Sequence, residues 1–459
     1  AYKLGKLIEQ RKLSPVELLD AIFRRIEELN PKLNAYLTLA QEQAYEAVRE
    51  AERRVVAGDK LGPLHGIPTS IKDLNETGGI RTTFGSLVYC DHIPQTEGVM
   101  MKRLKAAGAI IIGKTNTPEF GLALHTENRL GEPCRNPWNT ERTPGGSSGG
   151  AAAAAAAGIS PLTQGSDGGG SIRVPASFSG IFGLKPTFGR IPVKVRDWGT
   201  GNFGCLGPLS RNVRDAAMML NVMAGPDRSD YSCIRTSPPD YLKALDDKPR
   251  SLRIGWSPDL GYGVHVDSEV TSAVENAVKA FENMGHTVEE AAPKMGSPFY
   301  WGDINQNAVN GMAYREVLEK HPEKLTDYAK KRLQLVHELS GIEITRSWIE
   351  VEKMKGAMLD FFEKYDLLMC PTTATPAFRI GQRDKSLGMS VNEWPFCPFT
   401  IVFNLTQNPG ASVPCGISSD GLPIGLQIVG RLQDEVTVLQ AAAAFEQAHP
   451  WADKYPPVS

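Results

Sequence analysis

The hydrophobic positions near the start of the chain follow the repeat of an α-helix. Between residues 16 and 29, apolar side chains recur at helical spacing, at Val16, Leu18, Leu19, Ile22, Phe23, Ile26 and Leu29. Ser14, Pro15 and Glu17 supply the N-cap, the first-turn proline and the reciprocal carboxylate of a capping box. This pattern predicts an amphipathic helix within a helical segment 1–60 that packs against a larger body.

From about residue 63 the chain changes to short apolar runs separated by glycines. Three runs have the composition of strands buried on both faces: 67–71, 109–112 and 252–256. Helical runs at 99–107 and 268–281 lie between them, and a further strand-like run follows at 286–289. This alternation predicts an α/β fold with helices layered around one sheet.

We expect one large domain, because no proline-, serine- or charge-rich linker divides the 459 residues. Its expected parts are the N-terminal helices 1–60, a central core 61–226, a variable region 227–365 and a C-terminal part of the core 366–459. Segment 297–348 is rich in helix-forming residues and irregular in polarity. We therefore expect it to lie over the core, outside the sheet.

Composition excludes several classes of protein. Fifty Lys and Arg residues stand against fifty-two Asp and Glu, a formal net charge of -2, which gives no electrostatic reason to expect nucleic acid or a membrane surface as partner. The longest bland run is the seven alanines 151–157, far short of the ~18 apolar residues of a membrane span. The seven scattered cysteines form no CxxC pair. This argues against disulfides and a metal site and favours a cytoplasmic protein.

Two motif matches are rejected. Segment 108–115 fits the phosphate-loop pattern GxxxxGK[ST], but its four middle residues are one Ala and three Ile, the composition of a strand. Segment 146–150 fits the GxSxG nucleophile elbow, which requires a hydrophobic strand immediately before it. The preceding segment 136–144 is polar and contains two prolines. We therefore predict neither an NTP site nor a Ser-His-Asp hydrolase.

Two clusters rich in glycine and serine, 145–150 and 165–171, flank an alanine-rich segment. Glycines beside a serine let backbone N–H groups turn toward one point, so Gly168, Gly169, Gly170 and Ser171 could together donate to one oxyanion. Clusters of this composition are more often linkers or tight turns. Composition alone leaves both interpretations open.

Three sequence blocks occur in a recognisable order: Gly-Gly-Ser-Ser-Gly-Gly at 145–150, Asp-Gly-Gly-Gly-Ser-Ile-Arg-Val-Pro-Ala at 167–176 and Gly-Leu-Lys-Pro-Thr at 183–187. With these blocks the chain resembles the amidase signature family of serine hydrolases. Further matching blocks lie at 66–73, 113–116, 370–376 and 421–430. The resemblance is weakest between about 227 and 365. It implies a three-layer α/β/α sandwich with a mixed β-sheet, and an amidohydrolase that uses no metal and no cofactor.

The resemblance also implies a catalytic triad. Ser171 falls on the nucleophile, Lys72 on the base and Ser147 on the serine that relays a proton between them, with a cis peptide bond before Ser147. Gly121 and Leu122 match a segment that forms one wall of the acyl pocket in this family.

One position departs from the family pattern. Members commonly have Thr or Ile where this chain has Gly168. The extra glycine is expected to loosen the predicted oxyanion loop, Gly168 to Ser171, or to make room for a bulkier acyl group.

The chemistry sets a condition on the base. A serine hydroxyl needs a base to accept its proton, and no histidine lies in the signature blocks. Lys72 can act only when neutral, so its pKa must lie well below that of a free lysine. Burial at the end of strand 67–71 would achieve this by desolvation, whereas a lysine there could equally be a solvated surface residue. We expect Asp167 and Arg173 to brace the loop, or to form a buried ion pair without catalytic effect.

The triad does not select the substrate, because amides, anilides, esters and carbamates all pass through a tetrahedral centre. We expect selection by segments 189–203 and 227–364, whose large aromatic residues suit an aryl or alkyl group or belong to the core: Trp198, Phe299, Tyr300, Trp301 and Trp348. The expected activity is hydrolysis of small-molecule amides, with carbamates and esters included. The alternative is the glutamine-hydrolysing subunit of a tRNA-dependent amidotransferase. We expect a small-molecule substrate and no nucleic-acid or membrane partner, and the sequence allows a homodimer.

Overall fold

The computed structural model describes residues 1–193, 203–247, 250–381 and 396–459. Its strands are β1 (Tyr36–Leu39), β2 (Pro68–Lys72), β3 (Ile110–Thr115), β4 (Leu162–Asp167), β5 (Phe182–Lys185), β6 (Cys205–Ser210), β7 (Arg253–Trp256), β8 (Thr287–Glu290), β9 (Leu367–Pro371), β10 (Gly410–Ile417) and β11 (Pro423–Gly430). All of them belong to one sheet of 11 strands, in the order β1-β3-β2-β4-β6-β5-β10-β11-β9-β7-β8.

The sheet is mixed. β2 pairs in parallel with β3 and β4, and β7 pairs in parallel with β8 and β9, whereas the remaining pairs are antiparallel. Each of the four predicted parts of the chain contributes at least one strand. The division into those parts itself stays a prediction.

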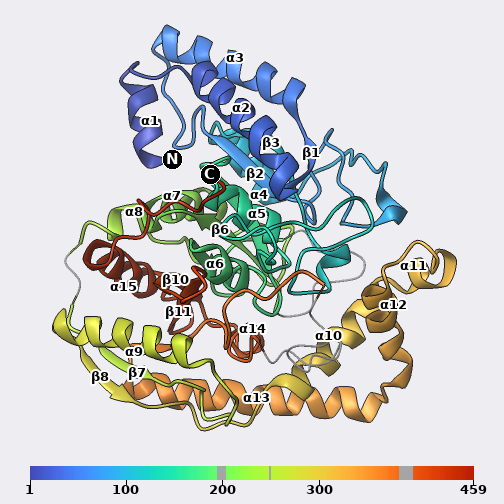
Figure 1. Cartoon of the computed structure of the whole chain (residues 1–459), viewed down its shortest axis with the longest axis vertical. Coiled ribbons are helices and arrows are strands. Elements are labelled where there is room, and N and C mark those ends of the chain that lie inside the picture. The colour runs from blue at the N-terminus through green and yellow to red at the C-terminus, as the bar shows by residue number, and fades with distance from the viewer. Residues whose placement is uncertain (194–202, 248–249, 382–395) are drawn as a thin grey trace.

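Helices cover both faces of the sheet, which confirms the predicted three-layer α/β/α sandwich (Figure 1). They are α1 (Tyr2–Glu9), α2 (Pro15–Leu33), α3 (Gln41–Ala57), α4 (Val99–Ala106), α5 (Gly149–Ala156), α6 (Arg173–Ser179), α7 (Val213–Met223), α8 (Tyr241–Ala244), α9 (Ser268–Asn283), α10 (Phe299–Ala313), α11 (Arg315–Lys320), α12 (Asp327–Gln334), α13 (Gly341–Lys364), α14 (Val402–Leu405) and α15 (Glu435–Ala448). Short 3₁₀ turns are η1 (Leu87–Tyr89), η2 (Glu119–Gly121) and η3 (Leu335–Glu338).

The local signals of the N-terminal segment act as predicted, with one exception. The capping box of Ser14 and Glu17 is formed at the start of α2. The exception is β1, which lies inside the segment expected to be helical and pairs antiparallel with β3. Only the first of its four residues is buried, so the strand has no apolar alternation that the sequence could reveal.

The structure agrees with the rejection of both motif matches. Gly113, Lys114 and Thr115 belong to β3, so the phosphate-loop match lies largely in a strand rather than in a loop. The segment before Ser147 is a run of turns and bridges, and no strand of the sheet precedes it directly. Neither match therefore has the backbone that its chemistry requires.

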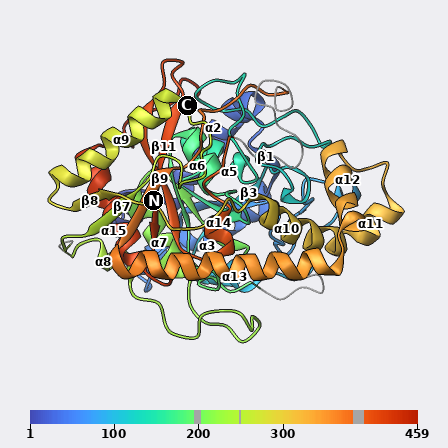
Figure 2. The same ribbon diagram turned by 90° about the horizontal axis from the view of Figure 1, so that it is seen from below.

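Helices α10 to α13 form the predicted excursion outside the sheet. In Figures 1 and 2, α10, α11 and α12 lie to one side of the sheet, and α13 runs along the outside of the molecule. Val317, Leu325 and Leu333 from this region share an apolar cluster with Phe84 and Phe120 of the central core. The excursion is thus packed against the part of the core that carries the signature blocks. No helix of the described residues is long and apolar enough to cross a membrane.

Candidate active site

Lys72 ends strand β2, which lies between two parallel neighbours deep in the sheet. Its side chain is fully buried, and Nζ lies 2.6 Å from Ser147 Oγ and 3.0 Å from Ser166 Oγ. Burial lowers the pKa of Lys72 well below that of a free lysine, although the charge of Asp167 acts in the opposite direction. The amine is therefore where the sequence argument required it, desolvated and beside a serine hydroxyl.

Burial by itself does not single out this lysine. Lys185 is equally buried and burial also lowers its pKa, but its Nζ donates to the Pro186 carbonyl and lies 3.9 Å from Cys205 Sγ. Lys114 is fully buried too, and its Nζ lies 3.7 Å from an oxygen of Asp73. The combination of a lowered pKa with a contact to a signature serine distinguishes Lys72.

Ser147 lies in the turn that leads into α5, and the Gly146–Ser147 peptide bond is cis, as the resemblance implied. Ser171 lies directly before α6, and its carbonyl accepts a hydrogen bond from the Ser148 N–H at 3.1 Å. Both hydroxyl-bearing side chains are buried and line one cavity of about 190 Å³. The structure thus brings the two signature serines and the buried lysine together.

Gly121 and Leu122, the predicted wall residues, line the same cavity. Gly121 has a φ of +73°, and a Cβ at this position would lie 3.2 Å from Ser147 Oγ and 2.7 Å from the Leu74 side chain. A glycine is therefore required here both by the left-handed backbone and by the closeness of Ser147.

The predicted oxyanion loop, Gly168 to Ser171, lies between β4 and α6. Within the described residues, no acceptor lies within hydrogen-bond reach of the N–H groups of Gly168, Gly169 or Ser171. The Gly170 N–H, in contrast, donates to Asp167 Oδ1 at 2.7 Å. Of the four predicted donors, Gly170 is therefore already engaged, whereas the other three form no hydrogen bond to a residue that the structure describes.

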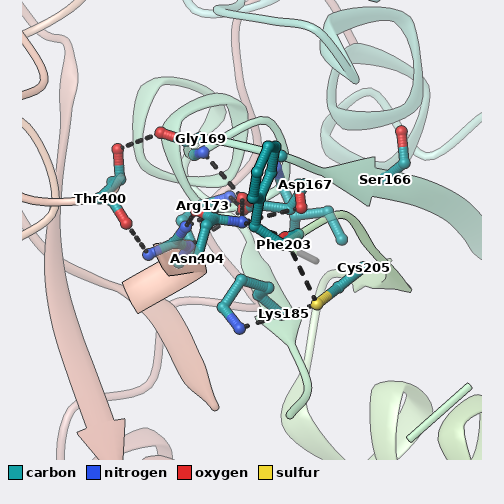
Figure 3. Close-up of polar contacts among 12 residues, drawn as sticks. Ser166, Asp167, Gly169, Arg173, Lys185, Phe203, Cys205, Thr400 and Asn404 are labelled. Atoms are coloured by element: carbon teal, nitrogen blue, oxygen red, sulfur yellow. Dashed lines mark hydrogen bonds and ion pairs between the residues drawn. The ribbon is translucent and has the colours of Figure 1, made fainter. Parts of the chain in front are cut away.

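A buried ion pair braces this loop, as expected. Arg173 donates from Nε and Nη2 to the two carboxylate oxygens of Asp167, at 3.0 and 2.9 Å (Figure 3). Burial alone would raise the pKa of Asp167, but the Arg173 guanidinium outweighs it and holds the pKa of that carboxyl well below its usual range. The carboxylate is therefore ionised and keeps its hydrogen bond to Gly170.

The guanidinium also joins distant segments to the loop. Arg173 donates to the carbonyl of Thr400 at 2.8 Å, to Asn404 Oδ1 at 2.6 Å and to Gln427 Oε1 at 2.8 Å. All these side chains are buried. The ion pair thus has its remaining polar atoms satisfied, which is the condition under which a buried pair is stable.

The aromatic residues around the cavity are not those that the sequence suggested. Phe84, Phe120, Phe203 and Tyr314 line it, and Phe120 stacks on Tyr314 with ring centroids 4.1 Å apart. Of the expected aromatic residues, Phe299, Trp301 and Trp348 pack against an apolar cluster, Tyr300 is 59% exposed and Trp198 lies outside the described residues. Phe299, Trp301 and Trp348 thus follow the core alternative, whereas Gln306 and Asn310 of α10 line the cavity.

Several further polar groups of the site carried no sequence signal. Ser166 contacts Lys72, Gln306 and Thr400 contact the oxyanion loop, and Asn404 contacts Asp167. Ser166 is the exception, because it lies within the glycine- and serine-rich cluster 165–171 and directly precedes the signature Asp167. The other three come from segments more than 130 positions away in sequence. Among the described residues there is also no group of His, Cys, Asp or Glu side chains able to hold a metal ion.

The profile of the Amidase family matches residues 17–439 of the chain. The protein belongs to the amidase signature family. Over 471 aligned residues it is 39% identical to an acylamidase of Rhodococcus erythropolis, covering 99% of this chain and 96% of that protein. It is 36% identical to one subunit of the glutamyl-tRNA(Gln) amidotransferase of Carboxydothermus hydrogenoformans, covering 97% of this chain and 96% of that protein.

Solved structures agree with this assignment. A bacterial aryl acylamidase of the amidase signature family superposes with a TM-score of 0.90 at 30% identity, covering 99% of this chain and 97% of that one. The 6-aminohexanoate cyclic dimer hydrolase gives the same TM-score of 0.90 and identity of 30%, covering 100% and 98%. The amidase signature protein described here is therefore an amide-hydrolysing enzyme.

The buried ion pair generates a prediction about stability. Asp167→Asn removes the negative charge and leaves the Arg173 cation buried without a counter-ion, so we expect the free energy of unfolding to fall by about 3–5 kcal/mol. The decrease would be measured as a lower apparent Tm at one fixed scan rate. The control is Asp246→Asn, which disrupts a pair with Arg214 in which the aspartate is 64% exposed, and which should leave the Tm unchanged. Equal Tm values for the two variants would contradict the structural role of Asp167.

Proposed function

We propose that this amidase signature enzyme hydrolyses the C–N bond of small amides that carry an aryl or alkyl group, through an acyl-enzyme on Ser171. The observation that carries the proposal is the contact of 2.6 Å between the fully buried Lys72 amine and Ser147 Oγ, in the cavity that Ser171 also lines. A neutral amine in this position can accept the proton of Ser147, which can in turn accept the proton of Ser171.

In the proposed acylation, Ser171 Oγ attacks the amide carbonyl while its proton passes to Ser147 and the proton of Ser147 passes to Lys72. The carbonyl oxygen gains a negative charge, which the N–H groups of Gly168, Gly169 and Ser171 can stabilise. The C–N bond then breaks, and the leaving nitrogen takes the proton held by Lys72, again through Ser147. An acyl ester on Ser171 and a free amine result.

Deacylation repeats the sequence with water. Water attacks the ester carbonyl, its proton moves along the same two groups, and the Ser171 oxygen recovers a proton as the carboxylic acid leaves. No step requires a metal or a cofactor. Carbamates and esters have the same tetrahedral intermediate, so we include them among the proposed substrates.

The lining of the cavity supports an aryl or alkyl substrate. Phe84, Phe120, Phe203 and Tyr314 supply its aromatic surface. Among the described lining residues, Asp167 carries the only full charge, and that charge is compensated by Arg173. Aromatic surface combined with uncharged polar groups, here including Asn75, Gln306 and Asn310, suits an aryl or alkyl group attached to a polar amide. The acylamidase and the aryl acylamidase similar to this chain are consistent with such a substrate.

The second candidate is the glutamine-hydrolysing subunit of a tRNA-dependent amidotransferase. The identity of 36% to a glutamyl-tRNA(Gln) amidotransferase chain favours it. Glutamine carries an ammonium and a carboxylate, which need charged partners in a buried site. The described lining residues offer no such free pair, so we place this function second. A cytoplasmic location and a homodimer stay predictions.

The choice between the two functions can be tested with the purified chain alone. We expect turnover of aryl and alkyl p-nitroanilides, with release of p-nitroaniline measured by absorbance, because the apolar cavity can hold the acyl group. Glutamine should give no detectable ammonia in the same preparation. Hydrolysis of glutamine alone, seen only in the presence of partner proteins of an amidotransferase, would establish the second candidate instead.

The nucleophile can be tested by trapping the acyl-enzyme. Ser171→Ala should lose all phosphonylation by a fluorophosphonate and all acylation by a slowly hydrolysed ester, because the attacking oxygen is absent. Intact-mass measurement should show one adduct per chain for the wild type and none for the variant, with the same apparent Tm. Ser160→Ala is the control, since its buried hydroxyl contacts Ser70 and the Leu162 carbonyl away from the cavity, and it should still be acylated. An adduct that persists in Ser171→Ala would remove this residue from the mechanism.

The lowered pKa of Lys72 predicts the direction of the pH dependence. The proposed base acts as the free amine, so kcat/KM should fall as the pH falls through the pKa of Lys72 and should level off above it. Lys72→Met should lower the plateau by about 10²–10⁴-fold and abolish the acid limb. Lys185→Met, a change at an equally buried lysine, should keep that limb. An acid limb with the same midpoint in Lys72→Met would show that another group is titrating.

A further inference from the structure

The oxyanion loop contains one peptide group whose orientation is not limited by side chains of its own residues. The Gly168–Gly169 peptide lies between two glycines, and a Cβ at Gly168 would meet no atom within 4 Å. Neither side chains nor packing at Gly168 therefore restrict its plane. In a trans peptide the N–H and the C=O point in opposite directions. A group that holds the Gly168 carbonyl thus also sets the direction of the Gly169 N–H.

Each carbonyl along this loop is held by a donor. The Asp167 carbonyl accepts from Asn404 Nδ2 at 2.9 Å, and the Gly169 carbonyl accepts from Thr400 Oγ1 at 2.6 Å. The Gly170 carbonyl accepts from the Val174 N–H at 2.8 Å. These three donors come from α6 or from the C-terminal part of the core. They fix the planes on either side of the Gly168–Gly169 peptide.

The Gly168 carbonyl is held by a donor from a different part of the chain. Gln306, on helix α10 of the variable region, donates from Nε2 to the Gly168 carbonyl at 2.7 Å. Its Oε1 accepts from Arg332 Nη2 at 3.0 Å, and Arg332 also pairs with Asp303 at 3.2 Å. Arginine has no acceptor atom, so the amide oxygen of Gln306 must face Arg332 and the amide nitrogen must face Gly168. Gln306 and Arg332 are both buried.

We propose that Gln306 is a positioning residue of the reaction, which directs the Gly169 N–H into the cavity by holding the Gly168 carbonyl. This inference rests on the proposed acyl-enzyme mechanism. Gln306 lines the cavity and contacts the loop, but it donates away from the position of the oxyanion. Its effect is on the orientation of a donor and therefore on the transition state rather than on substrate binding.

Two variants distinguish an effect on the orientation of the Gly169 N–H from an effect on packing around residue 306. Gln306→Glu keeps the shape of the side chain and the oxygen that faces Arg332. The charge of Arg332 keeps the new carboxyl ionised. The variant therefore places an oxygen, in place of the N–H donor, against the Gly168 carbonyl. Gln306→Leu removes both hydrogen bonds at similar size. The matched control is Gln440→Glu, because Gln440 Nε2 also donates to a backbone carbonyl, that of Ala244, at 2.8 Å and lies outside the cavity.

We expect kcat for an acyl p-nitroanilide to fall by about 10- to 100-fold in both Gln306 variants, less than the 10²–10³ seen when an oxyanion donor is removed outright. KM should stay within about two-fold. The inhibition constant of a trifluoromethyl ketone, which forms a tetrahedral oxyanion with a serine, should rise in parallel with the loss of kcat. The control should match the wild type in all three values. Wild-type kcat and inhibition constants in both variants, or a loss confined to KM, would overturn the proposal.

The same experiment distinguishes failure of this inference from failure of the proposed function. Intact-mass measurement of the wild type and of Ser171→Ala, each treated with a fluorophosphonate, reports whether Ser171 is the residue that reacts. Without an adduct on Ser171, the acyl-enzyme mechanism fails, and with it the premise for Gln306. With an adduct but unchanged Gln306 variants, the mechanism stands and only the positioning role is lost.

Discussion

The ion pair of Asp167 and Arg173 is the interaction on which the rest of the site depends. Both side chains are fully buried, so the pair is stable only because Thr400, Asn404 and Gln427 accept the remaining guanidinium hydrogens. The pair thereby holds the C-terminal part of the core against the loop before α6. It also affects Lys72. The carboxylate of Asp167 raises the pKa of that amine, whereas burial lowers it. Desolvation is the larger of the two effects, so the pKa of Lys72 is lowered and the amine can be neutral.

Local sequence signals predicted part of the fold. The capping box at Ser14 and the end of strand β2 at Lys72 were predicted from residues within one turn or one strand, and the structure has both. The early strand β1 was missed because its burial comes from pairing with β3, more than seventy positions later. Pairing over such distances leaves no periodicity in the sequence. The order of the eleven strands has the same cause and could be expected only through the family resemblance.

The residues of the site also fall into two groups, those in sequence blocks and those that only the fold brings together. Ser147, Ser171 and the glycines between Asp167 and Ser171 lie in contiguous blocks of unusual composition. That composition left their function open, and the family resemblance implied their roles. Gln306, Thr400 and Asn404 are ordinary polar residues in ordinary helices or loops, and only the folded chain places them against the oxyanion loop. The aromatic lining was left open for a related reason. Large aromatic residues occur in cores and in cavities, and composition does not show which of the two a given residue joins.

The helices of the variable region contact two different parts of the cavity lining. Tyr314, directly after α10, stacks on Phe120 of the wall segment, and Glu119 accepts from the N–H and the hydroxyl of Thr326 at the start of α12, both at 2.7 Å. On the other side, Gln306 of α10 holds the Gly168 carbonyl. Helix α10 and the residue directly after it therefore contact both the aromatic wall and the oxyanion loop. A substitution that tilts α10 to admit a larger substrate must also move Gln306. Under the proposed role of Gln306, substrate range and rate of acylation are coupled through this helix, although the proposed nucleophile and base both lie in the central core.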